Sequence, residues 1–484
     1  MKPTQQGADN RTGDGGANAR RNGWRALLIT VFLAALSALL MAAPAPAGLS
    51  PAGQRVLAVA VLAIGLWCTD VIPAAVTGLL VVIALTLSGG VPGLGAALVG
   101  FAEPVAYFLI GVLTIGLAVS QSGLAERVAL FFLRRCQGSS RALYLQLLLS
   151  FPLLTLLLPS ATTRTGILIH VYEQALDLGG ARRGAPLVKA VMLALNSTNR
   201  LASTVLLTGG ITPVLAASLI GGISWSRWFV LMVVPYGALL TVGALLIYGF
   251  YREGFKAPLS CLPVAETRPF SGREIRTLVI TLGASLLWLT DAWHHWNPAL
   301  PAIIAWACLL MPGIGVLTWR DFENNFGWAN LFVLASSLSL ARALGSSGAS
   351  AWIAESIVRG MPAFSQQPFL VLVILLLIAA PLRLLIPNMT GFLATTIPIA
   401  MAIGQATGIN PVICGLAVMI AGDAVLYYPA QSASSLVVYE RGHLTAGEIF
   451  RFGLWMTLVG YLVILFVALP YWSFVGEPLR LLPR

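Results

Sequence analysis

The stretch ALYLQLLLSFPLLTLLLPSATTRTGILIHVYEQALDLGG, residues 142–180, decides the fold of this chain. It consists of two apolar arms around a polar centre, PSATTRT at residues 159–165. Basic residues flank it on both sides: Arg134, Arg135 and Arg141 before it, and Arg182, Arg183 and Lys189 after it. Basic loops of membrane proteins stay on the cytoplasmic side, and a polar tip at membrane depth is tolerated only where protein or a cavity surrounds it. The pattern predicts a re-entrant hairpin whose tip is a candidate binding site.

The composition of the whole chain is that of an integral membrane protein. Of its 484 residues, 58% are hydrophobic and only 10% are charged, whereas a soluble domain has about 25% charged residues. At about 20 residues per spanning helix, the chain has material for roughly eleven to thirteen spans. The apolar stretches are long and unbroken rather than alternating, which disfavours a transmembrane β-barrel.

The charge and motif content excludes several functional classes. The net charge of +11 comes mostly from short loops between apolar runs, which is the positive-inside pattern rather than a nucleic-acid-binding surface. The five cysteines are scattered, with no CxxC pair, so neither a disulfide framework nor a zinc site is supported. No nucleophile and base, and no metal constellation, fall on facing segments. The sequence therefore predicts that the chain is not an enzyme and has no organic cofactor.

The N-terminus allows two interpretations. Residues 1–22 are polar and rich in Gly, Asn and Arg, which predicts a disordered tail. Arg20 and Arg21 before the apolar run 26–43 resemble a twin-arginine signal peptide. The run is longer than the roughly 7–15 residues of a signal core, and many apolar segments follow it. We favour an uncleaved first helix with a cytoplasmic N-terminus, in a multi-pass protein of the inner (plasma) membrane.

The chain contains an internal repeat. WCTD at 67–70 matches WLTD at 288–291, an offset of 291 − 70 = 221. Gly123 matches Gly348 at an offset of 225, and PSAT at 159–162 matches PNMT at 387–390 at 228. Three matches in order at nearly constant spacing indicate a duplicated unit. We expect a first repeat over 23–250, a cytoplasmic linker over 251–277, a second repeat over 278–476 and a tail over 477–484.

Each repeat is predicted to contain one hairpin and one broken helix. The second hairpin covers about 365–405, and its few flanking basic residues favour entry from the opposite face, so the repeats have inverted topology. The broken helices cover about 187–223 and 411–438, with breaks at TGGITP (208–213) and YPAQSAS (428–434). Such breaks supply ion and substrate ligands in transporters. For a single break, a simple kink is the alternative.

These motifs resemble the divalent anion/sodium symporter family, which carries dicarboxylates, citrate and sulfate. The resemblance extends from about residue 50 to residue 472. In that family each hairpin tip carries Ser-Asn-Thr, and the tips here read SAT (160–162) and NMT (388–390), the second followed by Pro398 and Ile399. The loops LTWRD (317–321) and GHLTAGE (442–448) are also similar.

The resemblance implies an all-α homodimer in lipid, with eleven spans and two hairpins per chain and an elevator motion. It also implies one sodium ion beside each tip and substrate carboxylates between the tips. The substrate-binding candidates are Ser160, Thr162, Thr163, Arg164, Thr212, Asn388, Thr390 and Ser432. The cation-binding candidates are Ser160, Ala161, Gly209, Gly210, Asn388, Met389 and Gln431.

The chain departs from the family motif at both tips. Ala161 and Met389 replace the tip asparagine. The family also has a Pro-Pro-Asn sequence at the break of each broken helix, and neither break here contains it. Sodium prefers hard oxygen ligands, which alanine and a thioether side chain do not supply. Coupling to sodium, coupling to protons and exchange for a counter-anion therefore all stay open.

Charged residues inside the apolar segments mark functional positions. Arg164 follows the first tip, and its planar guanidinium group can bind a carboxylate or sulfate through two parallel hydrogen bonds. Alternatively, Arg164 supplies the positive charge of a missing sodium ion. Arg383 precedes the second tip and is a second anion contact or a snorkelling side chain. Asp423 is expected to accept a proton or to pair with an arginine, and Arg200 to face the cavity. We expect a secondary transporter of small divalent anions; a passive anion channel is the alternative of another class.

Overall fold

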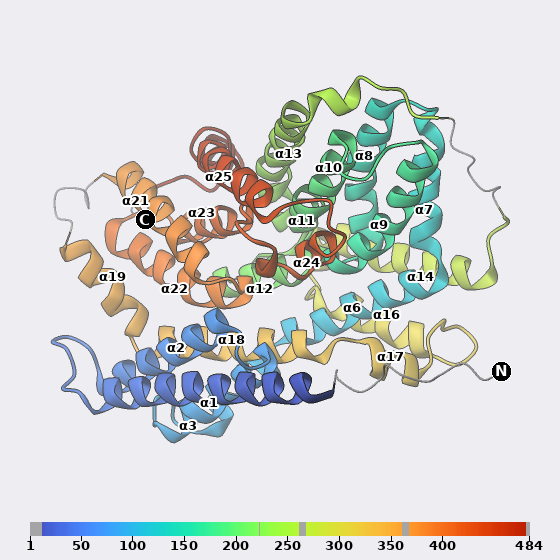
Figure 1. Cartoon of the computed structure of the whole chain (residues 1–484). Helices are drawn as coiled ribbons and strands as arrows, with labels where there is room; N and C mark the ends of the chain where they lie inside the picture. The colour runs from blue at the N-terminus through green and yellow to red at the C-terminus, as the bar shows by residue number, and fades with distance from the viewer. Residues whose placement is uncertain (1–11, 222, 261–267, 361–366, 481–484) are drawn as a thin grey trace, which may run out of the picture.

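The computed structural model describes residues 12–221, 223–260, 268–360 and 367–480, and the helices and turns of these residues make up the fold (Figure 1). Nine of the described helices are long and apolar enough to cross a membrane. Four other apolar helices have 10–17 residues: Ala74–Leu87, Ile211–Ile220, Ala299–Leu310 and Pro411–Asp423. The predicted all-helical, multi-pass membrane fold is confirmed. The nine long helices include three hairpin arms, Ser140–Leu157, Pro368–Leu385 and Met389–Thr407, so their number is not a count of complete spans.

One layer of the molecule combines helices from the start of each half. It contains α1 (Thr12–Ala42), α2 (Pro51–Thr69), α3 (Ala74–Leu87), α4 (Leu94–Ala97), α5 (Val99–Ala102), α6 (Pro104–Ser122), α16 (Ala299–Leu310), α17 (Trp319–Asn325) and α18 (Trp328–Ser346). Helix α6 packs against α16, and α18 packs against α3 and α5. These helices lie together along the lower part of Figure 1. We call them the scaffold layer.

The first hairpin consists of α8 (Ser140–Leu157) and α9 (Ala161–Leu178). The chain turns because Leu158 and Ser160 have extended backbones, and the Ser160 hydroxyl caps α9 by accepting from the Thr163 amide at 3.2 Å. The first broken helix follows as α10 (Pro186–Leu193), η2 (Ala194–Thr198), α11 (Asn199–Thr204), η3 (Leu207–Gly209) and α12 (Ile211–Ile220). At the break, a β-carbon on Gly209 would overlap the carbonyl oxygen of Ser203, so only glycine allows this close approach of the backbone.

The second half repeats this arrangement. Its hairpin consists of α21 (Pro368–Leu385) and α22 (Met389–Thr407), and the Asn388 side chain caps α22 by accepting from the amides of Thr390 and Gly391. Its broken helix consists of α23 (Pro411–Asp423), η5 (Pro429–Gln431) and α24 (Ala433–Tyr439). The remaining helices are α7 (Leu124–Leu133), η1 (Arg134–Cys136), α13 (Trp225–Phe250), η4 (Arg252–Phe255), α14 (Gly272–Leu289), α15 (Asp291–His294), α19 (Ala349–Arg359), α25 (Ala446–Val463), η6 (Ile464–Ala468) and α26 (Leu469–Phe474).

The two halves interlock beyond their breaks. Helix α12 of the first half packs against α22 and α23, and α24 of the second half packs against α9. Each short helix after a break therefore contacts the hairpin of the other half, and both tips meet in the same region. One contiguous core of buried apolar side chains continues through both halves. We call the hairpins with their broken helices the tip domain.

Two segment boundaries differ from expectation. Helix α1 begins at Thr12, so residues 12–22 are helical although the sequence predicts a disordered tail there; residues 1–11 lie outside the described part. Helix α14 begins at Gly272, within the expected linker 251–277, because Ser271 and Glu274 form a reciprocal capping box. Residues 261–267 of that linker and 481–484 of the expected tail also lie outside the described part.

Candidate functional site

A cavity of about 510 Å³ lies where both hairpin tips, both helix breaks and the scaffold layer meet. Of the predicted site residues, it is lined by Ser160, Ala161, Thr162, Thr163, Arg200, Gly209, Gly210, Thr212, Arg383, Met389, Thr390, Asp423, Gln431 and Ser432. Arg164 and Asn388 do not line it. The volume suits a small-molecule ligand.

Sequence reasoning missed several lining residues. Ser203 and Thr204 follow Arg200 by three and four positions, and this helical spacing places them on one face with it, so they were predictable. Ser434 lies in the predicted second break. Asn325 and Asn330 of the scaffold layer carry no sequence signal, because only the tertiary fold brings them to the tips.

Arg164 lies behind the first tip, fully buried. Its Nε donates to the side-chain oxygen of Asn199, and its Nη2 donates to the Asn199 carbonyl (2.7 Å) and the Ser203 hydroxyl (2.6 Å). Its Nη1 donates to the carbonyl of Leu158 at 2.9 Å. The guanidinium therefore ties the end of α8 to α11 and contributes its charge to the cavity from below the surface. Direct contact of Arg164 with a substrate stays a prediction.

Arg383 occupies the corresponding place at the second tip, with 1% of its surface exposed. Its Nη1 donates to the carbonyls of Ile386 (2.7 Å) and Pro387 (2.6 Å), and its Nε donates to the Gly422 carbonyl at 3.2 Å. Arg383 lines the cavity. Among the described residues its Nη2 has no hydrogen-bond partner, so this nitrogen retains two N–H donors for a ligand.

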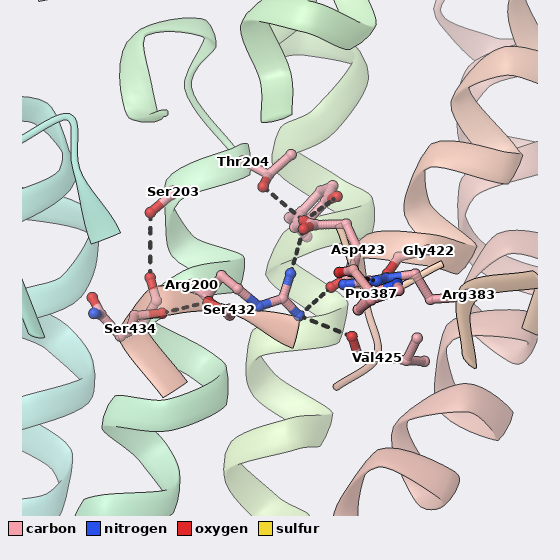
Figure 2. A network of polar contacts seen from close by, with 12 residues as sticks. Arg200, Ser203, Thr204, Arg383, Pro387, Gly422, Asp423, Val425, Ser432 and Ser434 are labelled. Atoms are coloured by element: carbon pink, nitrogen blue, oxygen red, sulfur yellow. Dashed lines mark hydrogen bonds and ion pairs between the residues drawn. The ribbon is translucent and has the colours of Figure 1, made fainter. Parts of the chain in front are cut away.

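Arg200 and Asp423 join the two halves across the cavity wall (Figure 2). Arg200 Nη1 donates to the Asp423 carboxylate, and Nη2 donates to the Asp423 carbonyl and, at 3.4 Å, to that of Val425. Asp423 Oδ2 also accepts from the hydroxyls of Thr204 (2.7 Å) and Tyr236 (2.9 Å). The Arg200 guanidinium and the hydroxyls of Thr204 and Tyr236 thus all donate to the Asp423 side chain.

Both N-terminal and C-terminal helix ends meet at the cavity, and the two kinds differ in the charge that they favour. Helices α9, α12, α22 and α24 begin there, and their first residues Ala161, Ile211, Met389 and Ala433 line it. Helix N-termini favour anions. The C-terminal ends of α8, α21 and α23 expose carbonyl groups, which favour cations. Guanidinium groups already occupy these carbonyls. Arg164 donates to Leu158, Arg383 donates to Ile386 and Gly422, and Arg200 donates to Asp423.

The side-chain oxygens that were expected to hold sodium already accept hydrogen bonds from the protein. Asn388 Oδ1 caps α22, and Gln431 Oε1 accepts from the Tyr427 amide at 2.6 Å. Ser160 Oγ accepts from the amide and hydroxyl of Thr163. The carbonyls freed at the tips accept from Arg164 and Arg383. A sodium ion there would compete with guanidinium donors for its oxygens and be repelled by their charge.

Comparison with known proteins is consistent with this architecture. A family model described as the sodium:sulfate symporter transmembrane region matches residues 21–477. A membrane protein of Cupriavidus necator is 25% identical over 92% of each chain. The citrate/succinate antiporter of Escherichia coli is 24% identical over 77% of this chain and 79% of its own. The L-tartrate/succinate antiporter of Escherichia coli is 24% identical over 78% of this chain and 80% of its own.

A solved structure supports the fold. The YdaH transporter of Alcanivorax borkumensis, whose crystal structure has an unusual topology, aligns with a TM-score of 0.56. The alignment covers 95% of this chain and 100% of that chain at 16% sequence identity. At this identity the likeness concerns the arrangement of helices alone.

Proposed function

The chain belongs to the sodium:sulfate symporter family, and we propose that it is a secondary transporter of small dicarboxylates and related divalent anions. The observation that carries the proposal is the charge of the cavity lining. Two arginines and one aspartate are the charged side chains of the described residues that line it, and Arg383 Nη2 donates to none of these residues. A guanidinium with free N–H groups in a buried site binds carboxylates strongly.

The neutral part of the lining supports the same ligand class. Ser160, Thr162, Thr390 and Ser432, which carry hydroxyl groups, line the cavity, and helices α9, α12 and α22 begin at it. Hydroxyls donate hydrogen bonds to carboxylate oxygens, and helix N-termini favour negative charge. The substrates for which two relatives are named, citrate with succinate and tartrate with succinate, are small di- and tricarboxylates, which supports a ligand with two or more carboxylates.

We propose that the tip domain carries this site past the scaffold layer in an elevator motion. All charged lining residues belong to the tip domain, whereas the scaffold layer contributes Leu113, Gly116, Leu117 and Ser120 from α6 and residues 325–327 and 330. A site whose charged groups all lie in one body can move with that body, and an uncharged wall allows sliding. Assembly as a homodimer in the plasma membrane, with the N-terminus in the cytoplasm, completes the proposal.

Uptake into proteoliposomes tests the function. Labelled succinate, malate, tartrate, citrate and sulfate are offered to vesicles that contain the purified full chain and unlabelled succinate. A carrier accumulates label above the outside concentration by counterflow, whereas a passive channel only equilibrates it. Arg359→Gln on the exposed end of α19 is the matched control for arginine variants of the cavity. Failure to accumulate any of these anions would overturn the proposal.

A further inference from the structure

A second pocket, of about 370 Å³, lies between the scaffold layer and the tip domain, and among the described residues it shares no lining residue with the cavity at the tips. Along α6 the pocket is lined by residues between 104 and 108, and the cavity by residues between 113 and 120. Along α12 the lining of the pocket begins at Val214, whereas residues 211–213 line the cavity. The pocket therefore lies at the other end of the same interface. Its volume suits a small-molecule ligand.

Both bodies supply walls of this pocket. Helix α12 of the tip domain contributes Val214, Ala217 and Ser218, and the scaffold layer contributes Phe108 of α6 and Arg342 of α18. Helix α12 packs against both of these scaffold helices, on the side of the tip domain that faces the scaffold layer (Figure 1). A displacement of α12 along α6 would therefore take the walls of the pocket apart.

The carboxylate in the pocket already has its partners. Glu103, directly before α6, accepts at Oε1 from Arg342 Nε (2.8 Å) and at Oε2 from the Ser218 hydroxyl (3.4 Å). The charges of Glu103 and Arg342 cancel, and the Glu103 side chain is only 17% exposed. A cationic ligand would have to displace Arg342 from this carboxylate and would be repelled by the guanidinium. The pocket therefore does not favour a cation.

The free hydrogen-bonding groups of the pocket are donors. Arg342 Nη1 and Nη2 donate to none of the described residues. Asn297 accepts at Oδ1 from the Ala299 amide at 2.9 Å, whereas none of the described residues accepts from its Nδ2. Ser224 Oγ accepts from the Arg227 amide at 3.2 Å. A ligand must therefore bring acceptors, and a carboxylate or sulfonate can receive two parallel hydrogen bonds from the end of a guanidinium.

The rest of the lining is largely apolar. It includes Pro104, Val105, Phe108, Leu207, Val214 and Ile223. A second negative charge on the ligand would lie against these side chains or near the Glu103 carboxylate, and both placements are unfavourable. An apolar ring or chain, in contrast, gains free energy from burial there. The lining therefore favours an anion with a single charge over the dicarboxylates proposed for the cavity.

We propose that this pocket is a regulatory site for an amphipathic monoanion, an apolar ring or chain with one carboxylate or sulfonate group, and that its ligand inhibits transport. The inhibition, unlike the binding, rests on the proposed transport function and its elevator motion. A ligand that contacts both bodies binds the arrangement described here and not one in which α12 has moved. It therefore stabilises this arrangement and holds the tip domain in place.

Calorimetric titration of the detergent-purified full chain with naphthalene-2-sulfonate tests the binding. This probe has one permanent negative charge and an apolar ring system. We expect saturable binding beyond the heat measured with empty micelles, and the same affinity in excess succinate, because the pocket and the cavity are separate. Naphthalene-2-sulfonamide, which lacks the charge, and methanesulfonate, which lacks the rings, should bind at least about tenfold more weakly. No binding, or loss of binding in succinate, would overturn the proposal.

Two variants remove the donors of the pocket separately. Arg342→Gln removes the guanidinium, and Asn297→Asp keeps the oxygen that accepts from Ala299 but replaces the amide donor with a second oxygen. Each variant should raise the dissociation constant of naphthalene-2-sulfonate about tenfold or more. Arg359→Gln, on the exposed end of α19, is the matched control and should leave it unchanged. Wild-type affinity in Arg342→Gln, or in Asn297→Asp where the first variant does not fold, would overturn the proposal.

Transport measures the consequence of binding. Proteoliposomes loaded with succinate are offered labelled succinate, with naphthalene-2-sulfonate on both sides of the membrane. At about ten times the dissociation constant, uptake should fall about tenfold, because a ligand of one state divides the free population of that state by 1 + [L]/Kd. Arg342→Gln should resist this inhibition in proportion to its weaker binding. Binding without inhibition would overturn the regulatory role. No uptake of any anion would instead refute the proposed function, and the titration would still decide whether the pocket binds the probe.

Discussion

Arg164 is a fully buried charge whose hydrogen bonds all go to the protein. Arg164→Ala leaves the Asn199 side chain and the Leu158 carbonyl without their donors. Unsatisfied buried groups cost about 1–3 kcal/mol each, so we expect the variant to unfold at lower temperature and to lose most transport. Thermal unfolding of the detergent-purified protein checks this, with Arg359→Ala as the exposed control. Undiminished stability and transport would show that Arg164 neither stabilises the fold nor contributes to transport.

Arg383 combines a structural and a ligand-binding role in one side chain. Its Nη1 and Nε hold the second tip, its side chain lines the cavity, and none of the described residues accepts a hydrogen bond from its Nη2. Arg383→Lys keeps the charge but loses the fork, so we expect a KM for succinate raised about tenfold with a smaller change in kcat. Arg383→Gln should abolish accumulation. A lysine variant with an unchanged KM would place the substrate away from Nη2.

The positions of the charged residues were predictable from the sequence, but their partners were not. Arg164, Arg200, Arg383 and Asp423 interrupt apolar runs, which marks them as functional. That Asp423 pairs with Arg200, 423 − 200 = 223 residues away, depends on how the two halves interlock. Likewise nothing local indicates that Arg164 faces α11 rather than the cavity, because its direction is set by Asn199 and Ser203 on another helix.

The hairpins and broken helices are the elements that the sequence predicts well. Their ends are marked by proline, glycine and capping residues within otherwise continuous apolar stretches. The expected hairpin at about 142–180 corresponds to α8 and α9, Ser140–Leu157 and Ala161–Leu178. The expected break at 208–213 contains Gly209 and Gly210, between α11 and α12. Boundaries are least accurate in the tail and the linker, where local capping, as at Ser271, extends a helix into a polar segment.

Gly209 gives a test at the level of an element. A methyl group there would overlap the Ser203 carbonyl, so Gly209→Ala must open the break. Because Ser203 also accepts from Arg164, we expect displacement of the first tip and at least about a tenfold loss of succinate uptake. Gly237→Ala, in α13 with open space around it, is the matched control and should transport normally. Full activity of Gly209→Ala would mean that the break does not shape the site.

At the scale of the whole molecule, a contact between the scaffold layer and the tip domain tests the elevator motion. Ser218 of α12 donates to Glu103, which precedes α6, at 3.4 Å. Arg342 of α18 pairs with the same Glu103 at 2.8 Å, but within the scaffold layer. If the tip domain slides, the first contact must break in every cycle and the second must persist.

Cysteine pairs distinguish these two contacts. In a background without the native cysteines, a short bifunctional thiol reagent on Glu103→Cys/Ser218→Cys should tie the tip domain to the scaffold layer and abolish succinate exchange, with recovery after cleavage of the crosslink. The same reagent on Glu103→Cys/Arg342→Cys joins two parts of one body and should leave exchange largely intact. Both pairs contain Glu103→Cys, so they differ mainly in whether the second cysteine lies in the tip domain or in the scaffold layer. Continued exchange by the crosslinked Glu103→Cys/Ser218→Cys protein would contradict an elevator and favour local opening of the hairpins around a stationary site.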